Sequence, residues 1–315
     1  MDILSDALLA LKIKNLMIGM FNLSAPWGFY TKNDNVGMSY TALDQSVWVT
    51  FENANAVELY QGDSIILPRG GLLSIASNRD AQLSRIEDVW QTTFSQGFDG
   101  FDRYPPGSYN ETSWGGGGEI SHLMGMIFEI EQTTRGALFD ALPNFILLRK
   151  YECPHFQTIK QALLSIVAEE NNLVSGEYAL KNNLSEALLR SQLRAHVLQT
   201  NYSSGIIAAI KDAFLHRALL AIHREPQKKW TVATLAEKAG LSRTAFSERF
   251  RKTLGDTPMN YTHSYRMQLA VSLLKDTKMS IEQIAHKLGY SSDRIFRAHF
   301  NRVYRLSPSH YRKLT

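Results

Sequence analysis

The sequence predicts a two-domain protein: an N-terminal all-β barrel with following helices, then a C-terminal all-α domain with two helix-turn-helix motifs. Its 315 residues are enough for two domains of ordinary size. The apolar pattern changes from short strand-like runs to helical spacing after Pro154, and a duplicated segment follows. We expect one domain over 1–204, β-rich to about 150 and helical over 156–200, and a second over 207–315.

Composition points to an ordinary globular chain, with 44% hydrophobic and 20% charged residues. Cys153 is the single cysteine, so an intramolecular disulfide is excluded and a reducing compartment fits. Asp2 and Asp6 stand where a signal peptide has basic residues, and no run of about 18 apolar residues is long enough to span a membrane. We expect a cytoplasmic protein that does not insert into membranes.

Short runs rich in β-branched and aromatic residues predict strands at Ser46–Phe51, Ala56–Tyr60 and Ser64–Pro68. Turn residues separate them, which is typical of a small β-sandwich or barrel. The segment 96–118 is rich in Asn, Gly and Pro and predicts a long irregular loop. It ends in four glycines, but no Lys-Ser or Lys-Thr follows them, so a phosphate-binding loop is not indicated.

Helical spacing begins beyond residue 156. Leu180, Leu184 and Leu188 recur every fourth position, which predicts two or more amphipathic helices up to about residue 200. Two roles fit this pattern equally: a homodimer surface, or a cover for the β-rich domain.

Charge is divided unevenly along the chain. Residues 207–315 carry 20 Lys and Arg against 8 Asp and Glu, a formal charge of +12, whereas the remainder carries 14 against 22, a charge of −8. A basic domain joined to an acidic one is expected when only one half contacts a polyanion such as DNA.

An internal duplication spaced by 49 to 50 residues occupies the basic half. Leu235-Ala236 and Gly240-Leu241 return as Ile284-Ala285 and Gly289-Tyr290, and the second copy also repeats residues Ser242, Phe246, Phe250, Pro258 and Tyr261 as Ser292, Phe296, Phe300, Pro308 and Tyr311. Each copy predicts a helix, a tight turn and a second helix, over about 231–255 and 280–305. The glycine would end the first helix and the serine would cap the second.

Within each second helix the two phenylalanines lie four residues apart and face one side, which leaves polar residues on the other. The candidates for reading base edges are Arg243, Thr244, Ser247 and Glu248 in the first copy and Asp293, Arg294 and Arg297 in the second. Arginine pairs with guanine, and an acid accepts from cytosine. The candidates for phosphate contacts are Arg251, Lys252, Arg302, Arg305 and Arg312.

Two such helices could enter successive major grooves about 34 Å apart, with a helix over about 259–274 as the spacer.

Five stretches of the basic half match sequence motifs of a known protein family: Trp230–Ala236, Gly240–Phe246, Gly255–Pro258, Tyr265–Ala270 and Ser307–Arg312. With them, residues 207–315 resemble the DNA-binding domain of the AraC/XylS family of bacterial transcription regulators. The resemblance implies a seven-helix domain, promoter DNA and RNA polymerase as partners, and a glycine where this chain has Arg305.

The remaining two thirds resemble the cupin-like N-terminal domain of one branch of that family, through residues 2–4, 23–28, 62–63, 67–68, 115–118, 142–143 and 222–223. This resemblance implies a small-molecule effector of unknown identity and a homodimer. Tyr40 and Leu73 stand where relatives frequently have histidines, so we expect no metal and no cofactor. Tyr40, Trp48 and Trp90 are candidates to line an effector pocket or to form plain core.

An enzyme is not expected, because Cys153 and His155 are too close in sequence to align for attack and His122 stands alone in an apolar stretch. The sequence therefore predicts a sequence-specific DNA-binding transcription regulator, which we expect to be an effector-responsive activator. Two alternatives stay open: a catalytic metal-binding cupin fused to a DNA-targeting module, and a ligand-free regulator whose N-terminal domain binds other proteins.

Overall fold

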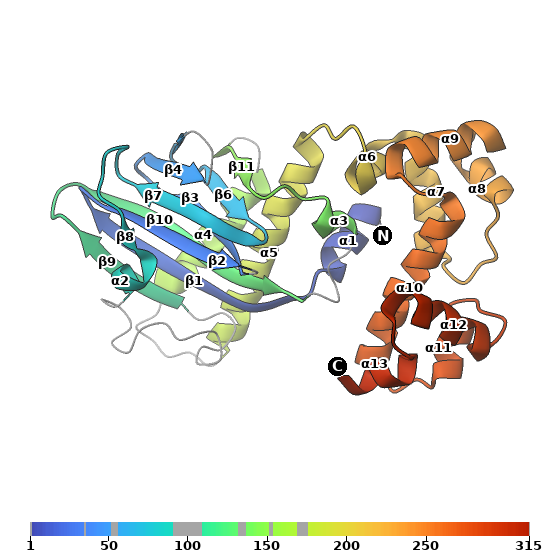
Figure 1. Ribbon diagram of the computed structural model, residues 1–315. Helices are drawn as coiled ribbons and strands as arrows, with labels where there is room; N and C mark the ends of the chain where they lie inside the picture. Colours follow the sequence, from blue (N-terminus) through green and yellow to red (C-terminus); the bar gives the residue numbers. More distant parts are fainter. Residues whose placement is uncertain are drawn as a thin grey trace. The chain divides into compact units, whose positions relative to one another are not determined.

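The computed structural model describes residues 2–34, 36–51, 56–90, 109–131, 137–150, 154–168 and 176–314 (Figure 1). Cys153 and residues 96–108 of the predicted loop lie outside this range. Contacts divide the chain into two units. The helical unit comprises Met1–Leu11, Gln132–Ala141 and Asn201–Thr315, and the sandwich unit comprises Lys12–Glu131 and Leu142–Thr200.

The sandwich unit contains two β-sheets, which confirms the predicted strand-rich half. The first sheet has the order β11-β6-β3-β10-β1-β9, built from β1 (Ile13–Ser24), β3 (Gly37–Ala42), β6 (Ser64–Leu67), β9 (Tyr109–Gly115), β10 (Ile120–Ile130) and β11 (Ile146–Leu148). The second has the order β5-β4-β7-β2-β8, built from β2 (Gly28–Asp34), β4 (Val47–Phe51), β5 (Val57–Leu59), β7 (Gly70–Ala76) and β8 (Ser84–Arg85).

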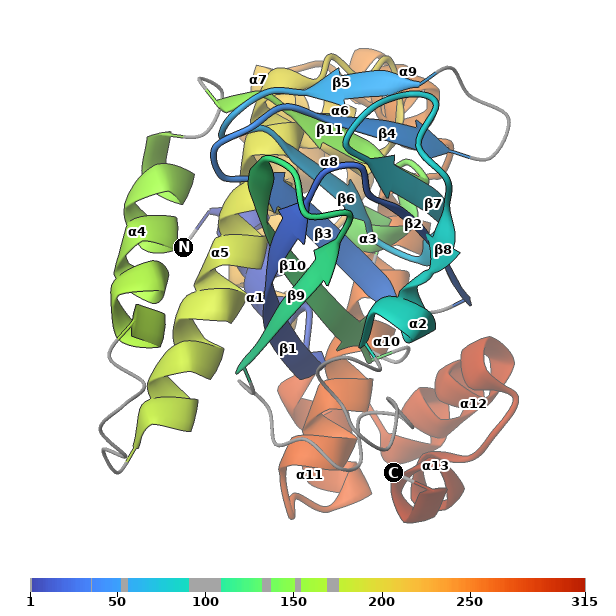
Figure 2. The ribbon, with the colours of Figure 1, turned by 90° about the vertical axis from the view of Figure 1, so that its left-hand side faces the viewer.

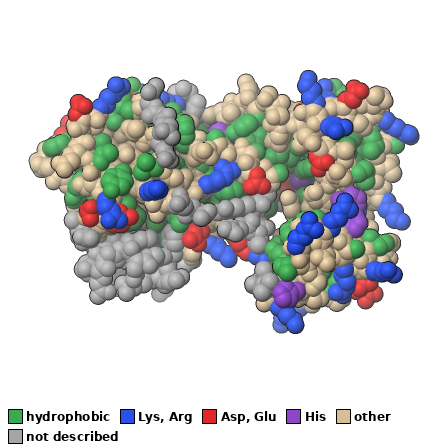
Figure 3. Space-filling view, viewed as in Figure 1, with side chains coloured by type: hydrophobic (Ala, Val, Ile, Leu, Met, Phe, Trp, Pro, Cys, Tyr) green, Lys and Arg blue, Asp and Glu red, His purple; other side chains and the backbone are tan. Residues whose placement is uncertain are grey.

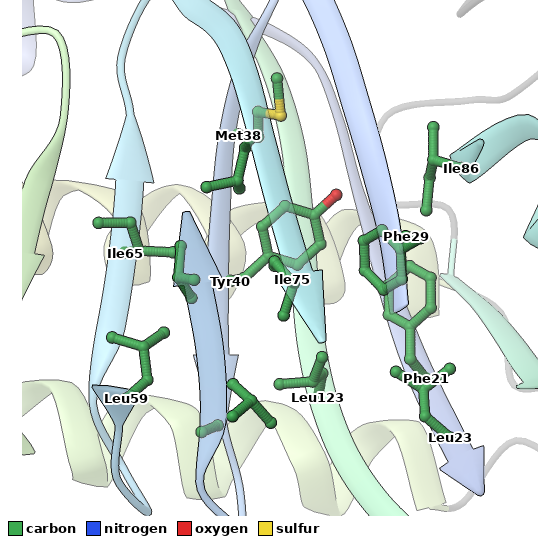
Figure 4. Close-up of a cluster of buried hydrophobic side chains, with 14 of the residues drawn as sticks. Phe21, Leu23, Phe29, Met38, Tyr40, Leu59, Ile65, Ile75, Ile86 and Leu123 are labelled. Atoms are coloured by element: carbon green, nitrogen blue, oxygen red, sulfur yellow. The ribbon is translucent and has the colours of Figure 1, made fainter. Parts of the chain in front are cut away.

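The core of this unit lies between the two sheets, because both contribute alternate side chains to one buried cluster. At its centre are the rings of Phe21, Phe29 and Tyr40, from β1, β2 and β3 (Figure 4). Their centroids are 5.8 to 6.2 Å apart. Such aromatic pairs each add about 0.5–1.5 kcal/mol beyond the area they bury. A short helix, α2 (Ile86–Trp90), adds Ile86 and Val89 to the cluster.

The glycine run connects two strands that lie on opposite sides of β1. β9 runs parallel to β1 and β10 antiparallel to it, so residues 115–118 must cross the end of β1. Gly116 and Gly118 donate backbone hydrogen bonds to the carbonyls of Ser24 and Ala25, at 2.7 and 2.8 Å. A Cβ at Gly115 would lie 2.0 Å from the Ser24 oxygen, so the crossing requires glycine. The segment 109–115, which we predicted as loop, is a strand.

Two helices follow the strands, α4 (Pro154–Ala168) and α5 (Glu177–Gln199). They lie side by side, and α5 contacts β1 and β11 of the first sheet (Figure 2). The predicted helices are therefore confirmed, but the buried side of α5 differs from the predicted leucine stripe. Leu180 is 49% exposed, whereas Ser185 and Gln192 are fully buried. The outer face of the sheet offers a polar partner, since the Ser39 hydroxyl donates to the Gln192 side-chain oxygen at 3.2 Å.

The helical unit contains both predicted helix-turn-helix motifs, α8 (Val232–Ala239) with α9 (Arg243–Leu254) and α11 (Ile281–Lys287) with α12 (Asp293–Tyr304). The long helix α10 (Pro258–Asp276) joins them, and α7 (Ala213–Arg224) and α13 (Pro308–Leu314) complete seven helices over residues 213–314. Three further helices belong to this unit: α6 (Gly205–Lys211), α1 (Ile3–Ala10), which contacts α7, and α3 (Ala137–Asp140), which contacts α6.

The duplication is repeated in atomic detail. Gly240 and Gly289 both adopt left-handed backbone angles, with φ of 74° and 79°. The next residue in each copy returns its N–H to the preceding helix, Leu241 to the Ala236 carbonyl and Tyr290 to the Ala285 carbonyl, both at 3.0 Å. Ser242 and Ser292 then cap α9 and α12 by accepting backbone hydrogen bonds of 3.3 Å. The two turns are therefore built by the same local chemistry.

The two turn glycines should differ in how well they tolerate alanine. Both substitutions place a side chain at positive φ, which costs about 1 kcal/mol. A Cβ at Gly289 would also lie 2.0 Å from the Gln227 carbonyl oxygen, whereas at Gly240 the nearest atom is the mobile Arg217 guanidinium at 3.5 Å. We expect Gly240→Ala to lower the free energy of unfolding by about 1 kcal/mol and Gly289→Ala by at least about 3 kcal/mol. Chemical denaturation of the full chain measures both, and equal losses would contradict the described turn.

Candidate nucleic-acid interface

The second helix of each motif, α9 and α12, is anchored by one face and exposed on the other. Phe246 and Phe250 on α9 and Phe296 and Phe300 on α12 are fully buried. The exposed stripe opposite them comprises Thr244, Ala245, Glu248, Arg251 and Lys252 on α9, and Arg294, Ile295, Ala298, Asn301 and Arg302 on α12. These positions correspond through the 50-residue offset of the duplication, so the two helices expose equivalent positions, although most of the side chains at them differ.

The residues predicted to read bases fall into two groups. Arg243, Thr244, Glu248 and Arg294 are exposed and Ser247 is half-buried. Asp293 and Arg297 are half-buried and pair with each other one turn apart, with Arg297 Nε 3.1 Å from Asp293 Oδ2. An exposed pair of this kind is worth about 0.3–0.5 kcal/mol, so it can rearrange when a stronger partner arrives.

Four of the five residues predicted to contact phosphate are exposed, namely Arg251, Lys252, Arg302 and Arg305. Arg305 ends α12 in the left-handed conformation with φ of 58°, as Gly255 ends α9 with φ of 73°. The N–H of each residue donates to the carbonyl four positions earlier at 2.8 Å. The last turn of α12 is therefore intact, although a side chain replaces the glycine implied by the resemblance.

Arg312, the fifth, is half-buried and bound to backbone within its own unit. Its guanidinium donates to the carbonyls of Leu274 and Met279 at 3.1 and 2.7 Å, across the turn that precedes α11. Arg266 does the same before α8, with bonds of 2.6 and 2.8 Å to the carbonyls of Pro226 and Lys228. Both arginines therefore hold the segment that leads into a helix-turn-helix motif, and we leave Arg312 out of the surface proposed to bind DNA.

Sequence analysis missed a third arginine with a structural role, Arg249. Its guanidinium lies 2.7 Å from Asp212, which also caps α7 by accepting from the N–H groups of Phe214 and Leu215. Partial burial opposes ionisation of Asp212, but these hydrogen bonds and Arg249 lower its pKa overall. Arg249 thus ties α9 to α7, which fixes the direction in which the exposed stripe of α9 faces.

The junction of α7 with α10 is aromatic. His223 stacks on Tyr265 with centroids 3.9 Å apart, and its Nε2 lies 2.9 Å from the Tyr261 hydroxyl. Burial lowers the pKa of His223 to about 4, so the ring is neutral at pH 7. This cluster fixes the long helix that separates the two motifs.

Basic side chains outnumber acidic ones on the face of the helical unit that Figure 3 shows. In Figure 3, blue Lys and Arg side chains are spread over this unit and red acidic side chains are fewer. This agrees with the formal charge of +12 over residues 207–315. A surface of this sign attracts the phosphates of nucleic acid.

The sandwich unit has a small apolar recess with a cavity volume of about 30 Å³. Gly19 on β1 is paired with Gly125 on the neighbouring strand β10, and both line this recess beside Phe21. Tyr40 and Trp90 also line it, as two of the three predicted residues. Trp48 is not among the lining residues, and the Arg79 guanidinium lies over its ring at 4.0 Å.

Other sequence candidates have ordinary surroundings. The His122 ring pairs with the Asp44 carboxylate and is part-exposed, and Leu73 lies in the core. Within the described ranges, no three His, Cys, Asp or Glu side chains gather closely enough to hold a metal ion. A search of the same residues finds no helix with the length and apolar character needed to cross a membrane.

Comparison with known proteins agrees with both halves of this architecture. A Cupin family model matches residues 2–198, and a helix-turn-helix domain model matches residues 235–314. The HTH-type transcriptional regulator AlkR of Acinetobacter baylyi is 28% identical over 292 residues, which are 91% of each chain. A putative AraC-like transcription regulator of Streptomyces lividans is 28% identical over 258 residues, 82% of this chain and 80% of that protein. The chain belongs to the AraC/XylS family.

Membership of the AraC/XylS family confirms the resemblance found in the sequence. The chain combines an N-terminal cupin region with a C-terminal helix-turn-helix domain, and it is a DNA-binding transcription regulator whose partner is double-stranded DNA. The DNA-binding domain of AdpA, solved in complex with a target DNA, is 29% identical and covers 33% of this chain and 92% of its own, with a TM-score of 0.31. The AraC/XylS relatives are named as regulators, which supports a role other than catalysis.

The His223 cluster makes the stability of the helical unit depend on pH. Because the pKa of His223 is about 4 in the folded state and 6.5 ordinarily, the unfolded chain binds the proton more tightly. The contribution of this group is complete above pH 6.5 and is lost as the pH falls toward 4, by on the order of 3 kcal/mol. Denaturation at pH 7 and pH 4.5 measures the loss. The variant His223→Gln should show a smaller loss, and an identical pH dependence in both proteins would contradict this role.

Proposed function

We propose that this regulator is an effector-responsive activator that binds promoter DNA with α9 and α12 in successive major grooves. The supporting observation is that both helices are anchored by an equivalent pair of phenylalanines and expose equivalent positions, 50 residues apart. Two recognition helices on one face of a duplex contact grooves about 34 Å apart. We further propose RNA polymerase as a partner and the cytoplasm as the compartment, because the family acts at promoters; a homodimer stays a prediction.

We assign base reading and phosphate binding to different parts of α9 and α12 and of the residues that directly follow them. Arg243 and Arg294, near the helix N-termini, would pair with guanine, and Glu248 would accept from cytosine. Thr244 and Ser247 suit several base edges. In α12, Asp293 would hold Arg297 in position for its base. Arg251, Lys252, Arg302 and Arg305 lie in or just beyond the last turn, where they would contact phosphates and set the register of the protein on the duplex.

Two alanine variants separate these roles. Arg294→Ala should weaken binding to the preferred site by about 1–3 kcal/mol and relax the preference at one base pair. Lys252→Ala should weaken binding to all sequences alike. It should also reduce the slope of the logarithm of the binding constant against the logarithm of the salt concentration by about one. Fluorescence anisotropy with the preferred site and with scrambled duplexes measures both. Variants that bind every duplex as the parent does would show that these side chains do not face DNA.

We place the effector in the recess of the sandwich unit between Gly19, Phe21, Tyr40 and Gly125. Its lining is mostly apolar, with Asn110 and Thr112 as the polar residues, and with a volume of about 30 Å³ it must widen to admit a compact apolar molecule. A ligand would change regulation only by binding one arrangement of the protein more tightly than another. The catalytic-cupin alternative is not favoured, because Tyr40 and Leu73 are packed in the aromatic and aliphatic core.

Filling the recess tests this placement. A Cβ at Gly19 would lie 3.4 Å from the Phe21 ring, an ordinary contact, so Gly19→Val adds its methyl groups to the recess without a backbone clash. Thermal-shift screening of a metabolite library should find compounds that stabilise the parent, by about 2.7 kcal/mol at 100 times the dissociation constant. The same compounds should not stabilise Gly19→Val. Compounds that shift both proteins equally bind elsewhere, and a screen without hits favours an N-terminal domain that binds proteins.

A further inference from the structure

The exposed stripe of α12 contains an apolar side chain that the roles above do not use. Ile295 is 44% exposed, and with Val303 it is one of two large aliphatic side chains that are exposed among the described residues of 201–313. It lies between Arg294 and the buried Phe296, at the position that Ala245 holds on α9. An isoleucine on a surface that must face solvent in the unbound protein contributes little to the fold. It gains apolar burial only when a partner covers it.

The surroundings of Ile295 restrict what that partner can be. Ala298 is exposed one turn further along the same stripe, so the two form an apolar strip about one turn long. Arg294 precedes the strip, and Asn301 and Arg302 follow it, all exposed. The partner must therefore carry apolar groups close to hydrogen-bond acceptors and negative charge. The major groove of DNA combines these, because the thymine C5-methyl group is its apolar feature and guanine and phosphate acceptors lie beside it.

We propose that Ile295, supported by Ala298, reads thymine methyl groups, so that α12 selects a thymine next to the guanine read by Arg294. The proposal rests on the proposed function in one respect, that α12 lies in a major groove. The equivalent of Ala298 on α9 is Glu248, which suits cytosine instead of thymine. The two motifs therefore read different bases, and the duplicated protein binds a site with a defined direction along the DNA.

Removing single methyl groups from the DNA tests the proposal. The preferred site is first recovered by selecting random duplexes with the full chain, and each thymine is then replaced in turn by deoxyuridine, which lacks only the methyl group. At one or two thymines beside a guanine, we expect the parent to bind about fourfold more weakly, the effect of one buried methyl group. Replacing such a T·A pair by C·G should weaken binding, and 5-methylcytosine at that position should recover part of the loss.

A variant and a matched control connect the effect to the side chain. Ile295→Ala should bind the thymine site more weakly than the parent and should distinguish thymine from deoxyuridine by less than twofold. Val303→Ala, at the other exposed aliphatic residue of α12, should keep the parent's affinity and its fourfold discrimination. Both changes lie on the surface, and the thermal stability of each variant confirms that it folds.

The possible failures are distinguishable. If the parent selects no sequence from the random pool, the proposed DNA contacts of α9 and α12 fail. If it selects a site but tolerates deoxyuridine at every thymine, or if Ile295→Ala discriminates as the parent does, the methyl-reading proposal alone is wrong. If Ile295→Ala binds DNA normally but activates transcription less, the strip contacts a protein partner, which also overturns the proposal.

Discussion

Burial of two aromatic pairs, Phe246 with Phe250 and Phe296 with Phe300, is the constraint on which the helical unit depends. Each pair packs in its domain core with centroids 5.6 and 5.8 Å apart, and each meets the tyrosine of the following helix, Tyr261 or Tyr311, edge-on. Because residues four apart share one side of a helix, burying these rings decides which side of α9 and α12 remains exposed. The capping serines and turn glycines then set where each helix begins.

The same anchoring leaves the exposed stripes to vary. The two copies share the phenylalanines, serine, glycine and tyrosine that build the core and the turn. The exposed positions differ between the copies: Thr244, Ala245 and Glu248 on α9 correspond to Arg294, Ile295 and Ala298 on α12. A duplicated scaffold with different surfaces allows one chain to read an asymmetric site without a second copy. Arg249, Arg266 and Arg312 are used inside the unit, and their bonds to Asp212 and to backbone carbonyls keep the two helices fixed relative to the core of their own motif.

Local signals made the helical unit predictable from sequence. Gly240 and Gly289 specify a turn because glycine adopts positive φ, and the two serines specify a helix start because their hydroxyls accept from the backbone. The same pattern occurs in both copies, so each copy supports the prediction made for the other. The sandwich unit was less predictable, because its register depends on contacts distant in sequence. β9 has no clear alternation and is a strand only because β1 pairs with it, and the glycine run is needed because it crosses β1 at Ser24.

Side-chain partners were the least predictable part of the candidate site. The pairing of Asp293 with Arg297 follows from helical spacing and could have been expected. The bonds of Arg312 to Leu274 and Met279 could not, because they join segments more than 30 residues apart. The buried side of α5 was predicted only in part: Leu188 is buried as expected, but Gln192 is also fully buried, with its side-chain oxygen accepting from Ser39 on β3.

The central claim is that α9 and α12 occupy two grooves on one face of a duplex. Protection of guanine N7 atoms from dimethyl sulfate, with the full chain bound to its selected site, tests it most directly. The account predicts two clusters of protected guanines whose centres lie about 10–10.5 base pairs apart, one for each helix. One cluster only, or two clusters on opposite faces of the DNA, would contradict it.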